Sequence, residues 1–230
     1  MLRIEGMNTH YGASHVLQGV DLDMPQGRIS AVLGRNGVGK TTMVKTIMGL
    51  VGLSGGRVHV GSTDITGWPP HRVAREGVAY VPEGRLIFPD LTVIENIKVG
   101  ERGPDSAWPL ARLLDLFPSL RERAANRGSQ LSGGEQQMLA IARALVRDPE
   151  IILLDEPFEG LAPVIVRDLV NACRDLAAAG QTIVLVEQNL AATLALAQRV
   201  YIINNGHIVH EGPALEIKKQ PEVLQRYLGV

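Results

Sequence analysis

Residues 34–41 read GRNGVGKT, which fits the pattern G-x-x-x-x-G-K-[S/T] in full. The run follows an apolar stretch that ends at Leu33, and it opens a helical pattern over residues 40–50. Glycines here let backbone N–H groups converge on phosphate oxygens, and the start of a helix adds a favourable dipole. A tight glycine turn would explain the glycines, but it needs neither the strand before it nor the helix after it. The motif therefore predicts a phosphate-binding loop, with Lys40 on the β- and γ-phosphates of a nucleotide and Thr41 on Mg²⁺.

Apolar runs and helical patterns alternate along the rest of the chain. The runs that begin at residues 151 and 183 are apolar throughout, which suits strands of a parallel sheet covered on both faces. The alternation predicts an α/β fold. Strands are expected over residues 28–33, 78–81, 151–154, 183–186 and 200–203, and helices over residues 40–50, 132–147, 164–179 and 189–198.

Three further segments depart from this alternation. Residues 2–30 and 57–65 are expected to form strands joined by turns, as an antiparallel edge. Asn204-Asn205-Gly206 lies between two apolar runs and predicts a hairpin. Residues 88–130 contain several prolines and arginines without a strong strand pattern, so we expect a helical insertion there.

The run IILLDE at residues 151–156 ends in two carboxylates. Ligands of open α/β sheets bind at the carboxyl ends of the strands. We therefore expect Asp155 to hold Mg²⁺, directly or through water, and Glu156 to orient and polarise an attacking water. Two acids at a strand end can also begin a solvated loop, but the phosphate loop in the same chain favours the first interpretation.

The run LSGGEQQ at residues 131–137 predicts the start of a helix, because Ser132 and Glu135 have the spacing of a capping box. An ordinary helix start does not explain Gly133 and Gly134, each of which weakens a helix. Glycines at a helix N-terminus let an anion approach bare N–H groups. A second phosphate-binding element beside a complete phosphate loop predicts two chains arranged head to tail, each completing the site of the other.

The composition limits the class of protein. Lys and Arg number 23 against 24 Asp and Glu, so a basic excess is missing and we expect no nucleic-acid partner. Cys173 is the only cysteine, and its helical surroundings predict a packed apolar side chain. The N-terminal residues lack the pattern of a secretory signal, and no run approaches the ~18 apolar residues of a membrane span. A role at a membrane would therefore require docking onto a protein that spans it.

These motifs, and their order along the chain, resemble the ATP-binding subunits of ABC transporters, for which LSGGEQQ matches the signature. The resemblance covers essentially the whole chain and implies a P-loop NTPase (RecA-like) core with an antiparallel β edge and an inserted α-helical subdomain. It implies one domain over residues 1–230, with residues 1–87 and 148–230 as the nucleotide-binding core and residues 88–147 as the helical subdomain. It also implies that Tyr11 stacks on adenine, although a half-buried strand tyrosine is the structural alternative.

Three positions depart from the general family pattern. Glu83 stands where a Gln usually links the sheet to the helical subdomain, Ala162 where an Asp is usual, and Gln188 where a histidine is usual. A Gln still donates a hydrogen bond to a γ-phosphate oxygen but carries no positive charge. These departures predict slow hydrolysis by a homodimer of this chain alone.

The segments VPEGR, EGLAP and LVEQN resemble the second ATP-binding subunit of branched-chain amino-acid importers. The resemblance implies two membrane-spanning permease subunits and a second, related ATP-binding subunit as partners, or a homodimer in isolation. A periplasmic binding protein would act indirectly, and the chain would lie peripherally on the cytoplasmic face of the inner membrane. Importers of urea or amides share similar segments, and a soluble ABC ATPase of the assembly type is a further alternative. Leu86, Ile87 and Phe88 are expected in the subdomain core or in a groove for a partner helix.

The candidate site residues fall into three groups. The expected catalytic residues are Lys40, Glu156 and Gln188, and the expected Mg²⁺ ligands are Thr41, Asp155 and Glu83. The expected ATP contacts are Tyr11, Gly34, Arg35, Asn36, Gly37, Val38, Gly39, Lys40, Thr41, Thr42, Glu83, Ser132, Gly133, Gly134 and Glu135.

Overall fold

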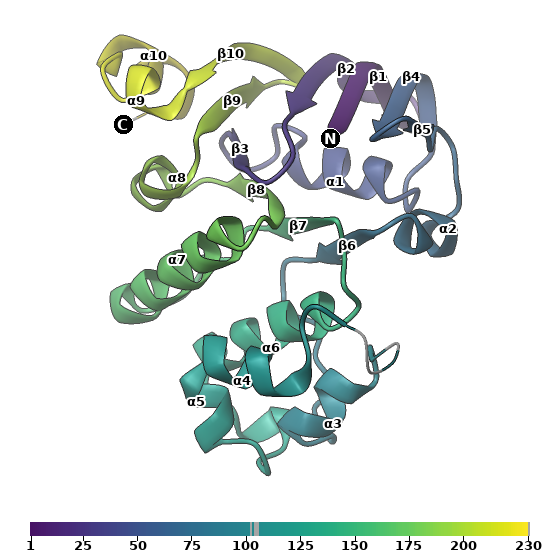
Figure 1. The fold of residues 1–230 in the computed structure, drawn as a ribbon. Helices are drawn as coiled ribbons and strands as arrows, with labels where there is room; N and C mark the ends of the chain where they lie inside the picture. Colours follow the sequence, from purple (N-terminus) through teal and green to yellow (C-terminus); the bar gives the residue numbers. More distant parts are fainter. Residues whose placement is uncertain (102, 104–105, 230) are drawn as a thin grey trace.

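The structure is a computed structural model of the chain and describes residues 1–101, 103 and 106–229. A six-stranded sheet in the order β10-β9-β3-β8-β7-β6 forms its centre (Figure 1). Neighbouring strands are parallel except at one edge, where β10 is antiparallel to β9. The strands are β3 (Ile29–Leu33), β6 (Val78–Val81), β7 (Ile151–Asp155), β8 (Thr182–Glu187), β9 (Arg199–Asn204) and β10 (His207–Pro213).

The central strands are buried on both faces, as their continuous apolar runs predict. In β7, Ile151 and Leu153 belong to one hydrophobic core, whereas Ile152 and Leu154 belong to the other. The first core contains α1 (Lys40–Ile47), and the second contains residues of α6 (Gly133–Leu145), α7 (Pro163–Ala178) and α8 (Leu190–Leu196). The α/β fold is therefore confirmed.

The N-terminal strands are antiparallel, as expected, but they form a sheet of their own rather than an edge of the central sheet. Its order is β2-β1-β4-β5, with β1 (Leu2–Tyr11), β2 (Ser14–Met24), β4 (Leu53–Val60) and β5 (Thr63–Asp64). Met7 and Leu22 are buried in the same core as α1. One face of the N-terminal sheet therefore packs toward α1, which a strand at the edge of the central sheet could not do. The antiparallel edge of the central sheet is formed by β10 instead.

The hairpin predicted at Asn204-Asn205-Gly206 joins β9 to β10. Asn205 and Gly206 have φ values of 46° and 78°, the left-handed region that a two-residue hairpin turn needs. A Cβ on Gly206 would lie 2.1 Å from the carbonyl oxygen of Val16, so only glycine fits. The N–H of Gly206 donates to the carbonyl of Val38 at 3.0 Å, and the turn therefore supports the phosphate loop.

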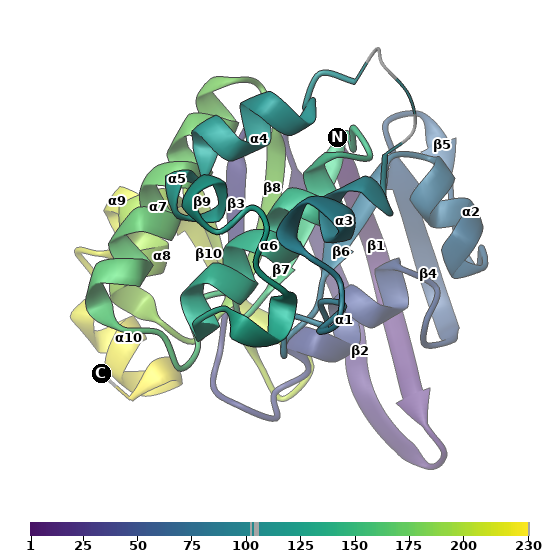
Figure 2. The ribbon, with the colours of Figure 1, turned by 90° about the horizontal axis from the view of Figure 1, so that it is seen from below.

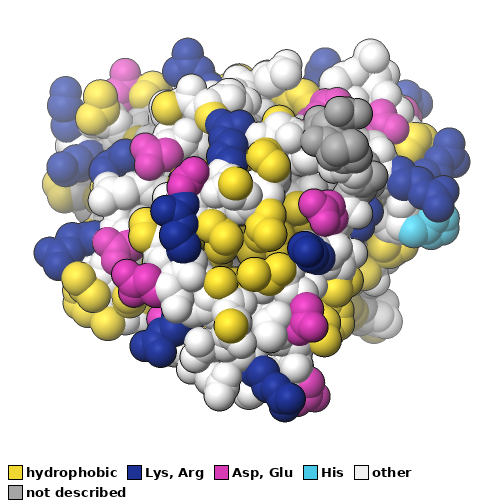
Figure 3. All heavy atoms as spheres, turned by 60° about the horizontal axis from the view of Figure 1, so that its bottom comes forward, with side chains coloured by type: hydrophobic (Ala, Val, Ile, Leu, Met, Phe, Trp, Pro, Cys, Tyr) yellow, Lys and Arg dark blue, Asp and Glu magenta, His cyan; other side chains and the backbone are white. Residues whose placement is uncertain are grey.

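The segment between β6 and β7 forms a helical lobe below the sheets in Figure 1, and Figure 2 shows the same lobe from below. This observation confirms the helical insertion, while its exact limits at residues 88 and 147 stay a prediction. Both signs of charge and a group of hydrophobic side chains occupy the face seen in Figure 3. The lobe contains α3 (Val93–Lys98), α4 (Leu110–Leu116), α5 (Pro118–Glu122), the 3₁₀ turn Gly128–Gln130 and α6.

The remaining helices cover the edges of the core. They are α2 (Pro70–Arg75), α9 (Ala214–Ile217) and α10 (Pro221–Leu228). Cys173 is buried in α7, where burial raises the pKa of its thiol to about 12, as expected for an apolar packing residue. Within the described part of the chain, no helix has the length and hydropathy that a bilayer crossing needs.

Candidate nucleotide-binding site

The phosphate loop connects the end of β3 to the start of α1, as the sequence predicts. Gly39 precedes the helix with φ 113°, a conformation that side-chain-bearing residues rarely adopt. A Cβ on Gly34 would lie 2.7 Å from the carbonyl oxygen of Ile203, so the loop passes directly against β9. Arg35, Asn36 and Gly37 are exposed at the tip of the loop. The loop thus presents backbone to solvent between two tightly packed ends.

Lys40 is buried beneath this loop. Its Nζ donates to the carbonyls of Gly34 and Arg35, each at 2.9 Å, and lies 2.9 Å from Oε1 of Glu156. The exposed fractions of the Lys40 and Glu156 side chains are 3% and 10%. The structure therefore brings together the two residues that the sequence predicts for phosphate binding and water activation.

Asp155, at the end of β7, lies beside the first turn of α1. Thr41 Oγ1 donates to its Oδ1 at 3.0 Å, and the Tyr80 hydroxyl donates to its Oδ2 at 2.9 Å. Burial raises the pKa of Asp155 although both hydrogen bonds lower it. Burial and the neighbouring Asp155 also raise the pKa of Tyr80, so its hydroxyl stays a donor. Two of the three expected Mg²⁺ ligands, Thr41 and Asp155, are thus in direct contact.

The donor set here fits Mg²⁺. Hydroxyl and carboxylate oxygens are hard ligands, and Mg²⁺ commonly takes only one or two carboxylates in addition to substrate phosphates and water. The charges of Glu83 and Glu156 raise the pKa of both Asp155 and Glu159, so several carboxylates face one region. A divalent cation would offset this repulsion.

Glu156 adopts an unusual backbone conformation for its residue type. Its φ is 48°, in the left-handed region, and its N–H donates to the carbonyl of Val186 at 2.8 Å. Strained backbone of this kind is common where a functional side chain must be aimed. The conformation turns the carboxylate toward Lys40.

Two site residues were missed by the sequence argument. Tyr80 holds Asp155, and Glu187, at the end of β8, joins two loops. Glu187 Oε1 accepts the N–H of Phe158 at 3.0 Å, and its Oε2 accepts those of Gln188 at 3.0 Å and Asn189 at 2.9 Å. The position of Glu187 at the end of a predicted strand was the available signal for a place in the site. Using it requires knowing that β8 lies next to β7, and the sequence alone does not give the strand order.

Replacing Glu187 with Ala is expected to lower the free energy of unfolding by about 1–3 kcal/mol, because three backbone N–H groups lose their acceptor. Denaturant unfolding at pH 7 measures this change. Glu187→Gln is the matched control: it keeps one acceptor oxygen without a buried charge, so most of the stability should remain. An equal loss of stability in both variants would show that the side-chain oxygens of Glu187 do not stabilise the fold as hydrogen-bond acceptors.

The pH dependence of stability has a definite sign at Glu187. Burial is the largest influence on the pKa of this carboxyl and raises it, against three N–H groups that lower it. A carboxyl with a raised pKa binds more protons in the folded chain than in the unfolded one. Its contribution to stability is therefore greatest at low pH and declines as pH rises from the unfolded pKa, about 4.3, through the folded value. Unfolding curves across this range should show a weaker decline for Glu187→Gln than for the unmodified chain.

The signature segment begins α6 with the predicted capping box. Ser132 Oγ accepts the N–H of Glu135 at 3.3 Å, and Glu135 Oε2 accepts the N–H of Ser132 at 2.7 Å. The N–H groups of Gly133 and Gly134 donate to no acceptor among the described residues. Gly134 also has a packing reason to be glycine, because a Cβ there would lie 2.4 Å from Cγ2 of Ile165.

The signature segment does not join the phosphate loop of its own chain. No hydrogen bond or ion pair within residues 1–101, 103 and 106–229 connects residues 132–135 with residues 34–42. Ser132 is exposed at the surface of the helical lobe. This separation is consistent with a site completed by a second chain.

The other predicted contacts lie at the surface. Tyr11, at the end of β1, is 49% exposed, so it fits the half-buried strand residue of the alternative interpretation as well as an accessible stacking residue. Glu83 and Gln188 are exposed, and Ala162 precedes α7 without a side-chain cap. The roles of Tyr11, Glu83 and Gln188 stay predictions.

Comparison with known proteins identifies the family. Residues 17–159 match the family model described as ABC transporter. The chain is 38% identical to the high-affinity branched-chain amino acid transport ATP-binding protein BraG of Pseudomonas aeruginosa, with 100% of both chains covered. It is 37% identical to the probable branched-chain amino acid transport ATP-binding protein LivF of Archaeoglobus fulgidus, covering 100% of this chain and 99% of the relative.

A solved structure shows the same fold. It is an ATP-binding cassette of an ABC transporter in its ADP conformation, 26% identical, with a TM-score of 0.88 and coverage of 100% of this chain and 99% of the other. The full-length likeness extends beyond the phosphate loop to both sheets and the helical lobe. The chain therefore belongs to the ABC transporter family, as one of its ATP-binding and ATP-hydrolysing subunits.

Proposed function

We propose that this chain energises an importer of branched-chain amino acids from the cytoplasmic face of the inner membrane. The observation that supports this solute class is the full-length likeness to two ATP-binding proteins of branched-chain amino-acid transport. The partners would be two membrane-spanning permease subunits, a second related ATP-binding subunit and, indirectly, a periplasmic binding protein. A homodimer would form in isolation.

The buried Lys40–Glu156 pair supports a mechanism in which ATP competes for Lys40. Phosphate oxygens arriving at the loop replace Glu156 as the acceptor of the ammonium. This exchange leaves the Glu156 carboxylate available to orient and polarise water. Binding of the triphosphate therefore prepares the residue that hydrolysis needs.

The Thr41–Asp155 contact supports a Mg²⁺ site at the start of α1. When bound there, Mg²⁺ would neutralise charge on the β- and γ-phosphates. Tyr80 fixes the second oxygen of Asp155, which leaves Oδ1 directed toward Thr41. Tyr80 is thus a positioning residue that holds the carboxylate in one orientation.

The free N–H groups of Gly133 and Gly134 support a nucleotide sandwich. Ser132 and these N–H groups would bind the γ-phosphate of ATP held by the phosphate loop of the facing subunit. Closure on ATP and opening after hydrolysis would then move the helical lobe. The site is complete only when two cassettes meet.

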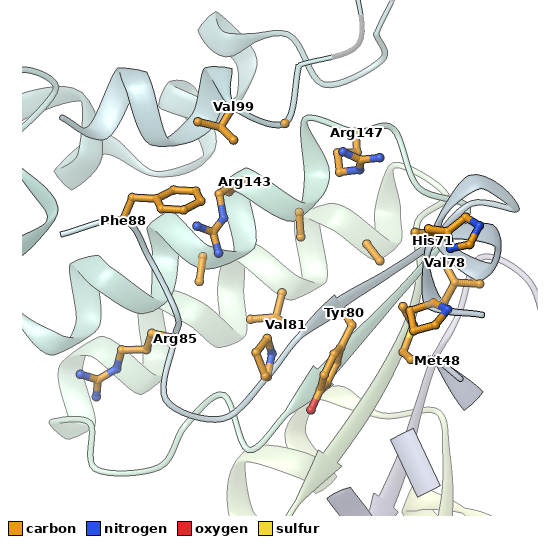
Figure 4. A pocket seen from close by; sticks show the side chains of 17 residues that line it. Met48, His71, Val78, Tyr80, Val81, Arg85, Phe88, Val99, Arg143 and Arg147 are labelled. Carbon is orange, nitrogen blue, oxygen red and sulfur yellow. The ribbon is translucent and has the colours of Figure 1, made fainter. Parts of the chain in front are cut away.

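A hollow between the sheets and the helical lobe supports docking of a permease segment (Figure 4). Its volume is about 480 Å³, and β6, α2 and α6 contribute most of its walls. Phe88 lines it at 44% exposure, and Leu86 beside it is 66% exposed, so neither is a residue of the subdomain core. Ile87 is partly buried against that core. Apolar side chains exposed beside a hollow are typical of a groove for a partner helix.

Uptake in cells that lack the chain tests the solute class. Loss of labelled leucine, isoleucine and valine uptake is expected, with recovery from a plasmid carrying the unmodified chain. A Phe88→Asp variant should fail to restore uptake while the isolated protein still binds ATP, because the charge blocks the groove and not the phosphate loop. Selective loss of urea or amide uptake would identify the alternative solutes. Unchanged uptake, with the chain absent from membrane fractions, would favour a soluble assembly ATPase.

A further inference from the structure

The guanidinium of Arg85 rests on the first glycine of the signature segment. A Cβ on Gly133 would lie 2.8 Å from Nη1 of Arg85 and 3.0 Å from its Nη2. In this structure the guanidinium therefore occupies the space beside the Gly133 backbone that a side chain would fill. The contact places a permanent positive charge at the N-terminus of α6, beside the free N–H groups of Gly133 and Gly134.

The backbone around Arg85 is held in a rare conformation. Gly84, Arg85 and Leu86 have successive φ values of 82°, 68° and 45°. The N–H of Leu86 donates to the carbonyl of Gly84 at 2.7 Å, and Nη2 of Arg143 donates to the carbonyl of Leu86 at 2.6 Å. These bonds hold the backbone on both sides of Arg85. Arg85 lines the edge of the hollow together with Phe88 and Arg143, and in Figure 4 its guanidinium points away from these two side chains.

The donors of Arg85 are not used within the chain. Among the described residues, its guanidinium has no hydrogen bond, ion pair or ring contact. Arg143, near the C-terminal end of α6, differs because it stacks over Phe88 and donates to the carbonyl of Leu86. A guanidinium offers five N–H donors in a fork that matches phosphate oxygens. Strained backbone that aims an unpaired arginine at a helix start therefore favours an anionic ligand at that point.

We propose that Arg85 binds the γ-phosphate of ATP held by the facing subunit, together with the signature N–H groups. This inference rests on the nucleotide sandwich proposed above. Arg85 would stabilise the closed dimer and the charge that develops on the transferred phosphoryl group. The loop also lines the docking hollow, through Arg85 itself and through Phe88. A permease segment that shifts this loop would therefore move a phosphate ligand of the facing site.

The test measures ATP-driven dimerisation by light scattering in a Glu156→Gln background, with ATP and Mg²⁺ present. Adding Arg85→Ala is expected to raise the dimer dissociation constant by at least about tenfold, the loss of one charge-assisted contact. ATP affinity of the monomer, followed with a fluorescent ATP analogue, should stay unchanged, because Arg85 does not contact the phosphate loop of its own chain. If Arg85 had only a structural role, its loss would weaken ATP binding by the monomer as well as dimerisation.

Three further variants make the test specific. Arg85→Lys keeps the charge and should restore part of the dimer affinity. Arg85→Gly also removes the guanidinium, but glycine adopts the positive φ without strain. If the guanidinium binds phosphate, Arg85→Gly and Arg85→Ala should raise the dimer dissociation constant equally. A smaller effect of Arg85→Gly would instead point to backbone strain. Arg57→Ala removes the same charge from exposed β4 and should have no effect on dimerisation.

The outcomes separate this inference from the sandwich itself. If the Glu156→Gln parent dimerises with ATP and Arg85→Ala dimerises equally well, the role of Arg85 is overturned and the sandwich stands. If the parent itself stays monomeric, the sandwich fails and the inference fails with it. Reduced ATP affinity of the Arg85→Ala monomer would also overturn the proposal, since it would assign Arg85 to its own chain's site.

Discussion

Glu156→Gln is expected to lower the steady-state ATPase rate by about 10²–10⁴-fold and to trap an ATP-bound dimer, because the amide cannot act as a base toward water. The structure adds a second effect. Glu156 pairs with Lys40 at 2.9 Å, and phosphate must displace it. The neutral amide competes less well for the ammonium, so the variant is expected to bind ATP more tightly than the unmodified chain. Phosphate release, light scattering and nucleotide titration measure the three consequences.

Glu122→Gln is the control for this prediction. Glu122 is an exposed carboxylate at the end of α5, in the helical lobe. Among the described residues it contacts none of Lys40, Thr41 and Glu156. Removing its charge should therefore leave the ATPase rate within a few-fold of the unmodified protein. A Glu156→Gln protein that stays monomeric with ATP and Mg²⁺ would argue against two facing subunits.

Lys40→Ala is expected to reduce ATP affinity by at least about 100-fold, since charge-assisted bonds to phosphate are lost. The variant should also unfold more easily, by about 3–5 kcal/mol, because a largely buried carboxylate loses its partner. The carbonyls of Gly34 and Arg35 lose their donor in the same step. Nucleotide titration and denaturant unfolding measure the two losses separately.

A second substitution distinguishes lost pairing from general damage to α1. The double variant Lys40→Ala with Glu156→Ala removes the unpaired carboxylate, so it should regain part of the lost stability while ATP binding stays weak. Lys45→Ala, on the same helix but outside the loop, should change stability by no more than about 0.5 kcal/mol. No recovery in the double variant would mean that the ion pair does not account for the instability.

Features set by local sequence were predicted well. The phosphate loop, the capping box at Ser132 and the Asn205-Gly206 hairpin depend on neighbouring residues, and the structure contains all three. Helix ends were less certain: the pattern over residues 40–50 continues past the observed end of α1 at Ile47. Gly49, with φ 68° and no room for a Cβ beside the carbonyl of Trp68, stops the helix earlier.

Features that depend on strand order could not be predicted. Tyr80 meets Asp155 only because β6 pairs with β7, and Glu187 meets Phe158 only because β8 lies on the other side of β7. The same limit applies to the signature glycines. Their close approach to anions was expected, but the contacts with Arg85 and Ile165 involve residues far away in the sequence.

The single carboxylate of Glu187 ties the segment after Glu156 to the segment that begins at Gln188. Because one side chain binds both segments, we expect them to move as a unit when the site changes conformation. A displacement of Gln188 should therefore reach Phe158 and the segment that leads to Ala162 at the start of α7. In the proposed pair of facing subunits, this connection would let one ATP influence the timing of the other.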